Sequence, residues 1–346
     1  MTANIDLRVS VVIPTFNRAE LLKFSVDSVL AALEPGDEVI VVDDGSTDHT
    51  EQLVASFGSP VRYLKTENRG AGAARNAGIA AANHDLVAFN DSDDVWLPNH
   101  LRLQRQIMAA RPDVLFCFSN FGGITAEQEH VHDSLGYWLE EFGYSRTCPW
   151  DRLIGAGVPF SSIGQLAQGE ADFKVHLGDI YPTELDFNYI SVITLLVRRR
   201  AAGKALHFPE DLNWGEDWEC MARLSRAGLA AYLDCETAEQ RVHSGPRLTK
   251  ADWVNKAALQ LKLIERVWGS DAGFMRQNRS RYQAAAARIH LVRARALIVQ
   301  GSTSEAREEL RLAGAAPFSY HALAALPGSL VRGLLNARRE VLGWVR

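Results

Sequence analysis

The sequence predicts an α/β fold: a parallel sheet with helices on both faces, followed by an all-helical C-terminal region. In the first hundred residues, four continuous apolar segments alternate with segments of helical period. Continuous hydrophobicity is typical of strands buried on both faces, as in parallel sheets covered by helices. Beyond residue 252 the pattern becomes helical. We therefore expect an α/β domain over residues 1–250 and a helical region over residues 251–346.

The elements of the first hundred residues follow in a regular order. Apolar side chains recur at helical spacing between residues 22 and 33, and a second helix is expected from Thr47 or Asp48 to Phe57. An Ala-rich helix follows the third strand. The expected strands lie at residues 9–13, 39–42, 61–64 and 86–89.

The pattern is looser in the rest of the chain. Residues 120–190 have no clear period, but strands are expected at residues 114–119 and 189–198, and a helix at residues 214–224. Residues 284–300 and 304–313 predict a helical hairpin. The amphipathic stretch 330–346 either packs on the core, which we favour, or lies on a membrane surface.

Composition excludes several classes of protein. The formal charge of −5 argues against a protein whose main task is to hold nucleic acid, which requires a basic surface. The four cysteines are widely spaced, without a Cys-x-x-Cys pair, which fits a reducing compartment. We recognise neither a secretory leader nor a run of about 18 apolar residues that would span a bilayer. The expected location is the cytoplasm.

Polar side chains follow the ends of the predicted strands. These residues are Asn17, Asp43, Asp44, Asp91 and Asp93. Because ligands of parallel α/β sheets bind at the carboxyl ends of the strands, we expect these side chains to converge on one site.

The segment F-N-D-S-D-D-V-W, residues 89–96, places three carboxylates within four positions. Their mutual repulsion in a water-poor site predicts a nearby positive charge. Hard oxygen ligands suit Mg²⁺ or Mn²⁺, and Mg²⁺ usually combines one or two carboxylates with substrate phosphates. The alternative is that Asp93 and Asp94 cap a helix near Pro98, although Leu97 occupies the usual cap position.

A glycine pair offers a second interpretation. Gly70 and Gly72 follow a strand and open a helix, with Asp91 about 20 residues on, as in a dinucleotide-binding fingerprint. Arg75 replaces the third glycine, and a side chain of that size would block the pyrophosphate but could bind a phosphate itself. An NAD(P)-dependent dehydrogenase is therefore the weaker enzymatic alternative, and a plain flexible turn remains open as well.

Five segments in order resemble the motifs of family 2 glycosyltransferases, which have the GT-A fold. The resemblance covers residues 7–245, and it implies a nucleotide-binding half (1–115) and an acceptor half (116–250). It also implies a nucleotide-diphosphate sugar donor, Mn²⁺ or Mg²⁺ at an Asp-x-Asp motif, and inverting, non-processive transfer of one sugar. The segments are S-V-V-I-P-T-F-N-R (10–18), V-I-V-V-D-D-G-S-T-D (39–48), N-R-G-A-G-A-A-R-N-A-G (68–78), N-D-S-D-D-V-W-L-P (90–98) and W-G-E-D-W-E (214–219).

The resemblance also implies roles for individual residues. Asp217 would be the general base, paired with Glu216, and Asp93 and His243 would hold the metal, with Asp94 less certain. Asn90 stands where many relatives carry an apolar residue. Asp44, with Asp43, would bind the base, Asp91 the ribose and Arg75 the phosphates. The expected nucleotide-sugar-binding residues are Pro14, Thr15, Asn17, Asp43, Asp44, Arg75, Asp91 and Ser92.

Each of these assignments has a structural alternative. Asp43 is suited to an Asx turn, Asp217 to the first turn of a helix, and a lone histidine such as His243 is often structural. The identity of the base stays open, because a carboxylate suits uracil, thymine and guanine alike.

The acceptor would be bound by residues 120–213, whose aromatic side chains suit sugar rings but also suit a core. A carbohydrate, a lipid-linked sugar or a small molecule would each fit, as in polysaccharide biosynthesis. The sequence is also compatible with a homo-oligomer and with peripheral membrane contact through the C-terminal helix. The rival function is a catalytically silent GT-A module that binds a nucleotide sugar or a protein partner.

Overall fold

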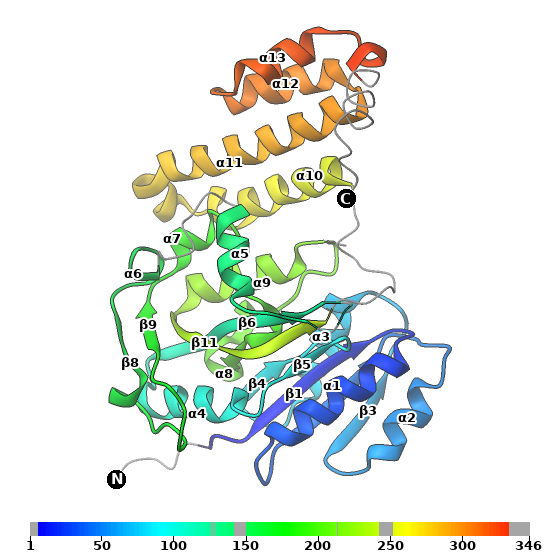
Figure 1. Ribbon diagram of the computed structural model, residues 1–346, viewed down its shortest axis with the longest axis vertical. Helices are drawn as coiled ribbons and strands as arrows, with labels where there is room; N and C mark the ends of the chain where they lie inside the picture. Colours follow the sequence, from blue (N-terminus) through cyan, green and yellow to red (C-terminus); the bar gives the residue numbers. More distant parts are fainter. Residues whose placement is uncertain are drawn as a thin grey trace. The chain divides into compact units, whose positions relative to one another are not determined.

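The computed structural model describes residues 6–125, 127, 129–141, 150–212, 214–241 and 252–331 (Figure 1). The contacts divide the chain into two compact units, Met1–Gly245 and Pro246–Arg346. Each unit is described by itself.

The first unit is built on one mixed sheet, in the order β3-β2-β1-β4-β10-β6-β11-β9-β8, with β5 paired to β11 and β7 to β6. The strands β1 to β4 are mutually parallel, as the sequence predicts. The short β10 lies antiparallel between β4 and β6. The strands are β1 (Val9–Thr15), β2 (Glu38–Asp43), β3 (Val61–Lys65), β4 (Leu86–Phe89), β5 (Asp94–Trp96), β6 (Val114–Ile124), β7 (His130–Val131), β8 (Gly157–Pro159), β9 (Lys174–Gly178), β10 (Leu196–Arg198) and β11 (Leu229–Arg241).

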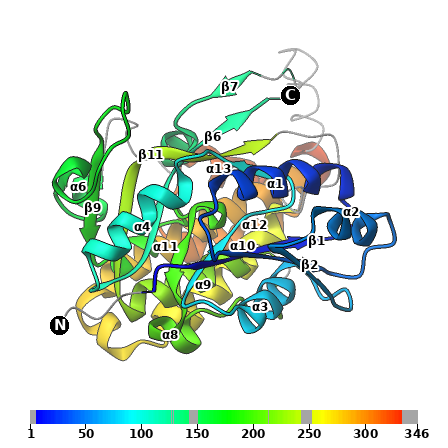
Figure 2. The same ribbon diagram turned by 90° about the horizontal axis from the view of Figure 1, so that it is seen from below.

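Helices cover both faces of this sheet, which confirms the predicted fold class. The helices are α1 (Ala19–Ala32), α2 (Thr50–Phe57), α3 (Ala71–Ala81), α4 (His100–Ala110), α5 (Ser134–Glu141), α6 (Trp150–Leu153), α7 (Tyr181–Glu184), α8 (Arg199–Ala202) and α9 (Glu216–Ala227). Figure 2 shows α1 and α4 on one face and α3, α8 and α9 on the other.

One predicted strand is mostly absent. Of residues 189–198 only Leu196–Arg198 forms a strand, and Val192–Thr194 is a 3₁₀ turn. Two buried side chains take the carbonyls that a strand would pair: Trp96 Nε1 donates to Ile193 O at 2.8 Å and Gln104 Nε2 to Thr194 O at 2.9 Å. An apolar run that is buried on all sides gives no period by which this turn could be recognised.

The helix that carries Arg75 lies unusually close to the sheet. A Cβ added at Gly78 of α3 would lie 2.3 Å from Cγ1 of Val12 on β1. Real Cβ atoms do not approach that closely, so glycine lets α3 pack against the centre of the sheet. Close packing of α3 on β1 therefore requires glycine at position 78.

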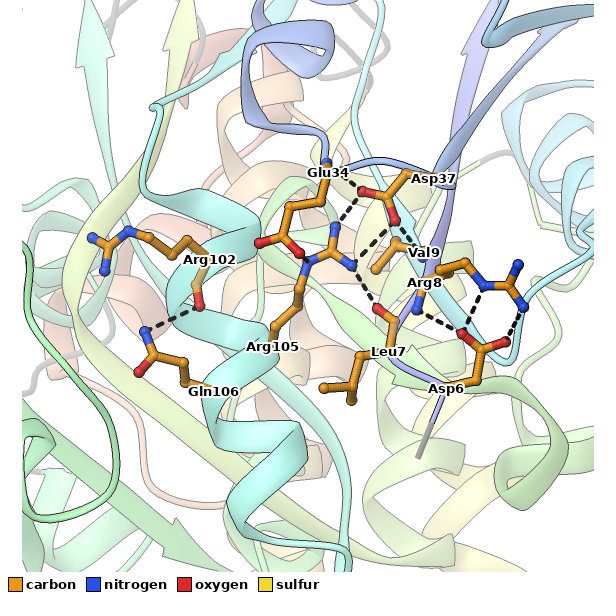
Figure 3. Close-up of polar contacts among 9 residues, drawn as sticks. All are labelled: Asp6, Leu7, Arg8, Val9, Glu34, Asp37, Arg102, Arg105 and Gln106. Carbon is orange, nitrogen blue, oxygen red and sulfur yellow. Dashed lines mark hydrogen bonds and ion pairs between the residues drawn. The ribbon is translucent and has the colours of Figure 1, made fainter. Parts of the chain in front are cut away.

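A buried ion pair joins the amino ends of β1 and β2 to α4 (Figure 3). Asp37 precedes β2, and its carboxylate accepts the backbone N–H groups of Val9 at 2.8 Å and Glu34 at 2.7 Å. It also accepts hydrogen bonds from both terminal nitrogens of Arg105, and the bond from Nη1 is 3.1 Å long. Arg105 Nη1 donates to Leu7 O at 2.5 Å as well. The cluster holds β1, β2 and α4 together away from the polar strand ends.

The second unit is helical, as the sequence predicts. It contains α10 (Trp253–Ile264), a π-helical turn at Glu265–Gly269, α11 (Ala272–Gln300), α12 (Thr303–Ala313) and α13 (Phe318–Ala325). The hairpin between α11 and α12 turns at Gly301, whose φ of 79° suits glycine. Its core includes Leu297, Ile298 and Leu310.

Two findings bear on the expected membrane contacts of the chain. None of the helices that the structure describes is long and apolar enough to cross a membrane. The amphipathic segment expected at residues 330–346 falls almost entirely outside the described residues, which end at Val331.

Candidate active site

The loops after β1 and β2 are locked to each other by their polar side chains. Asn17 adopts a φ of 52°, its N–H donates to Ser46 Oγ at 2.8 Å, and its Oδ1 accepts the N–H of Thr47 at 2.8 Å. Asp43 accepts the N–H of Ser46 at 2.7 Å and the hydroxyl of Tyr63 at 2.5 Å. Asp43 therefore forms the local turn that its sequence context allows.

Asp44 faces the N-terminus of α3. Its carboxylate accepts the backbone N–H groups of Arg69 at 2.9 Å and Gly70 at 2.7 Å. These are the amides that a dinucleotide fingerprint would present to a pyrophosphate. A Cβ at Gly72 would lie 3.2 Å from Pro209 O and 3.3 Å from Cγ of Glu216, so this glycine allows protein packing. Both observations argue against the dehydrogenase alternative.

The three clustered carboxylates turn to three different partners. Asp91 Oδ1 accepts Arg75 Nη2 at 2.7 Å, and Asp93 Oδ2 accepts Arg18 Nη1 at 2.5 Å. Asp94 begins β5 and accepts the backbone N–H of Arg241 at 3.1 Å, so it does not cap the following helix. The nearby positive charge expected from their repulsion is therefore supplied by two arginines of the chain. Repulsion alone does not require a metal here.

The expected metal ligands are only partly visible. Among the described residues, no group of three or more His, Cys, Asp or Glu side chains is arranged to hold a metal ion. His243 lies outside the described residues. Asp93 keeps 18% of its side chain exposed, and its hard oxygen atoms suit Mg²⁺ or Mn²⁺. Such a site fits one protein carboxylate completed by substrate phosphates.

Buried residues at the ends of β1 and β4 hold the acids of the candidate site in place. Asn90 Nδ2 donates to Ser25 Oγ at 2.9 Å and to Asp94 O at 3.1 Å, which explains a polar residue at this buried position. Ser92 is buried too. Pro14 and Thr15 end β1 in the core of the sheet, and the backbone of Thr15 accepts the N–H of Asp44 at 2.9 Å.

Arg75 links Asp91, just after β4, to α9. Its guanidinium is buried, bonds Asp91 as described, and donates through Nη1 to Glu216 Oε1 at 3.2 Å. The guanidinium carbon also lies 5.2 Å from the ring centroid of Phe208. Burial disfavours its charge, but Asp91 and Glu216 outweigh that cost and raise its pKa above the ordinary value.

The fold raises the pKa of Asp217 into the neutral range. Burial and the negative charge of Glu216 raise its pKa to about 7, and the positive charge of Arg75 limits the rise. The residue is half-buried in the first turn of α9, where its Oδ1 accepts the N–H of Trp218 at 2.7 Å. A carboxylate with this pKa can take up a proton at neutral pH.

Three residues of the site were missed from the sequence. Arg18 closes the first quoted motif, so its position gave a signal. Phe16, just after β1, is 44% exposed. Glu184 is fully buried. Neither of its carboxylate oxygens makes a hydrogen bond of good geometry to a described residue, and the backbone N–H of Tyr189 favours its charged form and so lowers its pKa. Burial and Asp217 raise the pKa of Glu184 well above its usual range.

Comparison with known proteins gives the family of the chain. Residues 10–163 match the model of glycosyl transferase family 2. An uncharacterized glycosyltransferase of Rickettsia typhi is 37% identical over 273 residues, which are 78% of this chain and 72% of the relative. Matches to several other curated relatives span less than a third of their length.

Solved structures share the fold at low identity. Staphylococcus aureus TarS 1–349 in complex with UDP-GlcNAc superposes with a TM-score of 0.54 at 17% identity, over 88% of each chain. The mannosyltransferase PcManGT of Pyrobaculum calidifontis, in complex with GDP-Man and Mn²⁺, has a TM-score of 0.54 at 18% identity, over 96% of this chain and 80% of that one. The ordered motifs, the fold and the relative from Rickettsia typhi lead to one conclusion: the chain belongs to glycosyl transferase family 2.

Proposed function

We propose that this protein transfers a single sugar, with inversion, from a nucleotide-diphosphate sugar to an acceptor hydroxyl, and that Asp217 is the general base. The observation that carries the proposal is the place of Asp217 in the first turn of α9, next to Glu216, which Arg75 joins to Asp91 at the strand ends. Burial and Glu216 raise the pKa of Asp217 to about 7. A general base works best when its pKa lies near the working pH. The acceptor is a carbohydrate, a lipid-linked sugar or a small molecule.

Asp217 takes the proton of the acceptor hydroxyl as that oxygen attacks the anomeric carbon. Direct attack from the side opposite the leaving diphosphate inverts the anomeric centre, so no covalent enzyme intermediate is formed. Glu216 has a different part: it holds Arg75 at 3.2 Å and raises the pKa of Asp217. One carboxylate base is then sufficient for the reaction.

The donor binds at the ends of β1, β2 and β4. Asp44 reads the base, Asn17 and Asp43 shape the pocket in which the base lies, and Asp91 binds the ribose. Pro14, Thr15 and Ser92 line this pocket through their backbone. Arg75 lies beside the diphosphate. The exposed ring of Phe16 is available to the flat face of the base.

A divalent cation, Mn²⁺ or Mg²⁺, fits Asp93, with His243 as a second candidate ligand. When bound, it would stabilise the negative charge that grows on the departing diphosphate. In the structure Asp93 Oδ2 accepts Arg18 Nη1 at 2.5 Å, so the cation would compete with Arg18 for this carboxylate. The presence of Mn²⁺ with GDP-Man in PcManGT supports the choice of metal.

A panel of UDP-, GDP- and dTDP-sugars tests this function. We expect one nucleoside diphosphate to raise the melting temperature with Mn²⁺, since a ligand stabilises the folded state in proportion to its affinity. Slow release of nucleoside diphosphate from the matching donor should follow. Asp217→Asn should bind the donor and lose release by orders of magnitude, whereas Asp27→Asn, an exposed residue paired to Lys23 on α1, should act like the wild type.

Two results would contradict the proposal. Undiminished release by Asp217→Asn would remove Asp217 from the base role. Donor binding without any release by the wild type, with or without candidate acceptors, would favour the silent module instead.

A further inference from the structure

The catalytic pair on α9 is tied to the donor side by one buried cation. Arg75 lies on α3, Asp91 follows β4, and Glu216 opens α9, so the guanidinium joins three elements. Its two terminal nitrogens are divided between the two acids, Nη2 to Asp91 at 2.7 Å and Nη1 to Glu216 at 3.2 Å. Only 6% of its side chain is exposed.

This geometry leaves Arg75 little freedom to act as a mobile phosphate ligand. The ring of Phe208 covers one face of the guanidinium, and Nε is buried without a partner among the described residues. A planar guanidinium that donates one bond to each of two acids fixes the orientation of both. Arg75 is therefore built into the site as a fixed charge between its two halves.

We propose that Arg75 is a positioning residue that holds Glu216 at the donor site and keeps the neighbouring Asp217 in its charged, proton-accepting form. The proposal rests on the proposed function, in which Asp217 is the base. It adds that the ionisation of the base is set by a residue of the nucleotide-binding half. Donor binding at Asp91 then acts on the base through a single side chain.

The charges around Asp217 support this assignment. Glu216 lies on the same helix, Glu184 on the packed helix α7, and Asp91 on the donor side, and all three are acids. Glu216 and Asp91 raise the pKa of Asp217, whereas Arg75 lowers it. Among these neighbours Arg75 is the one that favours the ionised base. An opposite charge close to a carboxyl group lowers its pKa by about 1 to 3 units, and Arg75 reaches the neighbour of Asp217 on α9, Glu216, at 3.2 Å.

The pH profile of kcat tests the proposal. For Arg75→Met we expect the acid limb to move up from about pH 7 by at least ~1 unit, so that turnover falls about fivefold at pH 7 and recovers near pH 9. Arg75→Lys keeps the charge and should restore most of the wild-type profile at saturating donor. Glu216→Gln removes an acid and should move the limb in the opposite direction.

The Glu216→Gln variant keeps the test decisive if Arg75→Met does not fold, because the two shifts have opposite signs. An equal loss of kcat at every pH in Arg75→Met, or an unmoved limb in Glu216→Gln, would overturn the proposal. Failure of the proposed function looks different: the wild type would then show no turnover, or an acid limb that persists in Asp217→Asn.

Discussion

The buried ion pair between Asp37 and Arg105 gives the sharpest test of what holds the sheet to α4. The change is Asp37→Asn, which keeps the shape of the side chain and one acceptor oxygen but removes the negative charge. Asp37 has no exposed side-chain surface, and its carboxylate accepts four hydrogen bonds, two from backbone N–H groups and two from Arg105. The amide nitrogen of the new asparagine would face donors.

The magnitude follows from the cost of leaving Arg105 without its partner. Only 7% of the Arg105 side chain is exposed, and the other nearby acid, Glu34, lies 3.8 Å away with 58% of its side chain exposed. Breaking a buried pair by removing one charge costs about 3–5 kcal/mol. An exposed pair is worth about 0–1 kcal/mol, which sets the scale for a control.

Urea unfolding of the full chain is the measurement. We expect Asp37→Asn to lower the urea midpoint by about 1 M or more, given a loss of about 3–5 kcal/mol and a slope of about 3 kcal/mol per M. The matched control is Asp113→Asn, whose partner Arg111 at 2.6 Å and whose own side chain are both substantially exposed. Its midpoint should stay close to that of the wild type.

The double variant Asp37→Asn with Arg105→Met should recover part of the loss, because no unpaired buried charge remains. If Asp37→Asn lowers the free energy of unfolding by less than about 1 kcal/mol, or by no more than the Asp113→Asn control, the ion pair does not hold α4 to the amino ends of β1 and β2.

Three other predictions follow from the site and its support. Gly78→Ala should lose about 1–3 kcal/mol in thermal unfolding, since its Cβ would lie 2.3 Å from Val12; an unchanged melting temperature would mean that α3 shifts freely. Because the pKa of Asp217 is raised to about 7 and the base must be ionised, kcat/KM should rise with pH through about 7 and level off above it; a flat profile from pH 5 to 9 would contradict this. Asp93→Ala should remove the Mn²⁺-dependent part of nucleotide stabilisation in a thermal-shift assay, and unchanged stabilisation would exclude Asp93 as a metal ligand.

The local pattern was sufficient for most of residues 1–115. The runs around Val12, Val41 and Val87 are continuously apolar because both faces of the sheet are covered, and they became β1, β2 and β4. The polar residues just past these runs lie together at the carboxyl ends of the strands, as the rule for parallel sheets requires. The second half was harder, since β10 is short and side chains replace the sheet partners of residues 193 and 194.

The sequence by itself determined the class of fold and the acids that follow the carboxyl ends of the strands, where the candidate site lies, because hydrophobic period and strand ends are local properties. Only the tertiary structure decided which positive group each acid meets. Arg18 and Asp93 are 75 residues apart and Arg75 and Glu216 are 141 apart, so no local pattern pairs them. The burial that raises the pKa of Asp217 likewise exists only when α7 and α9 pack together, which is why the chemistry of the site depends on the fold.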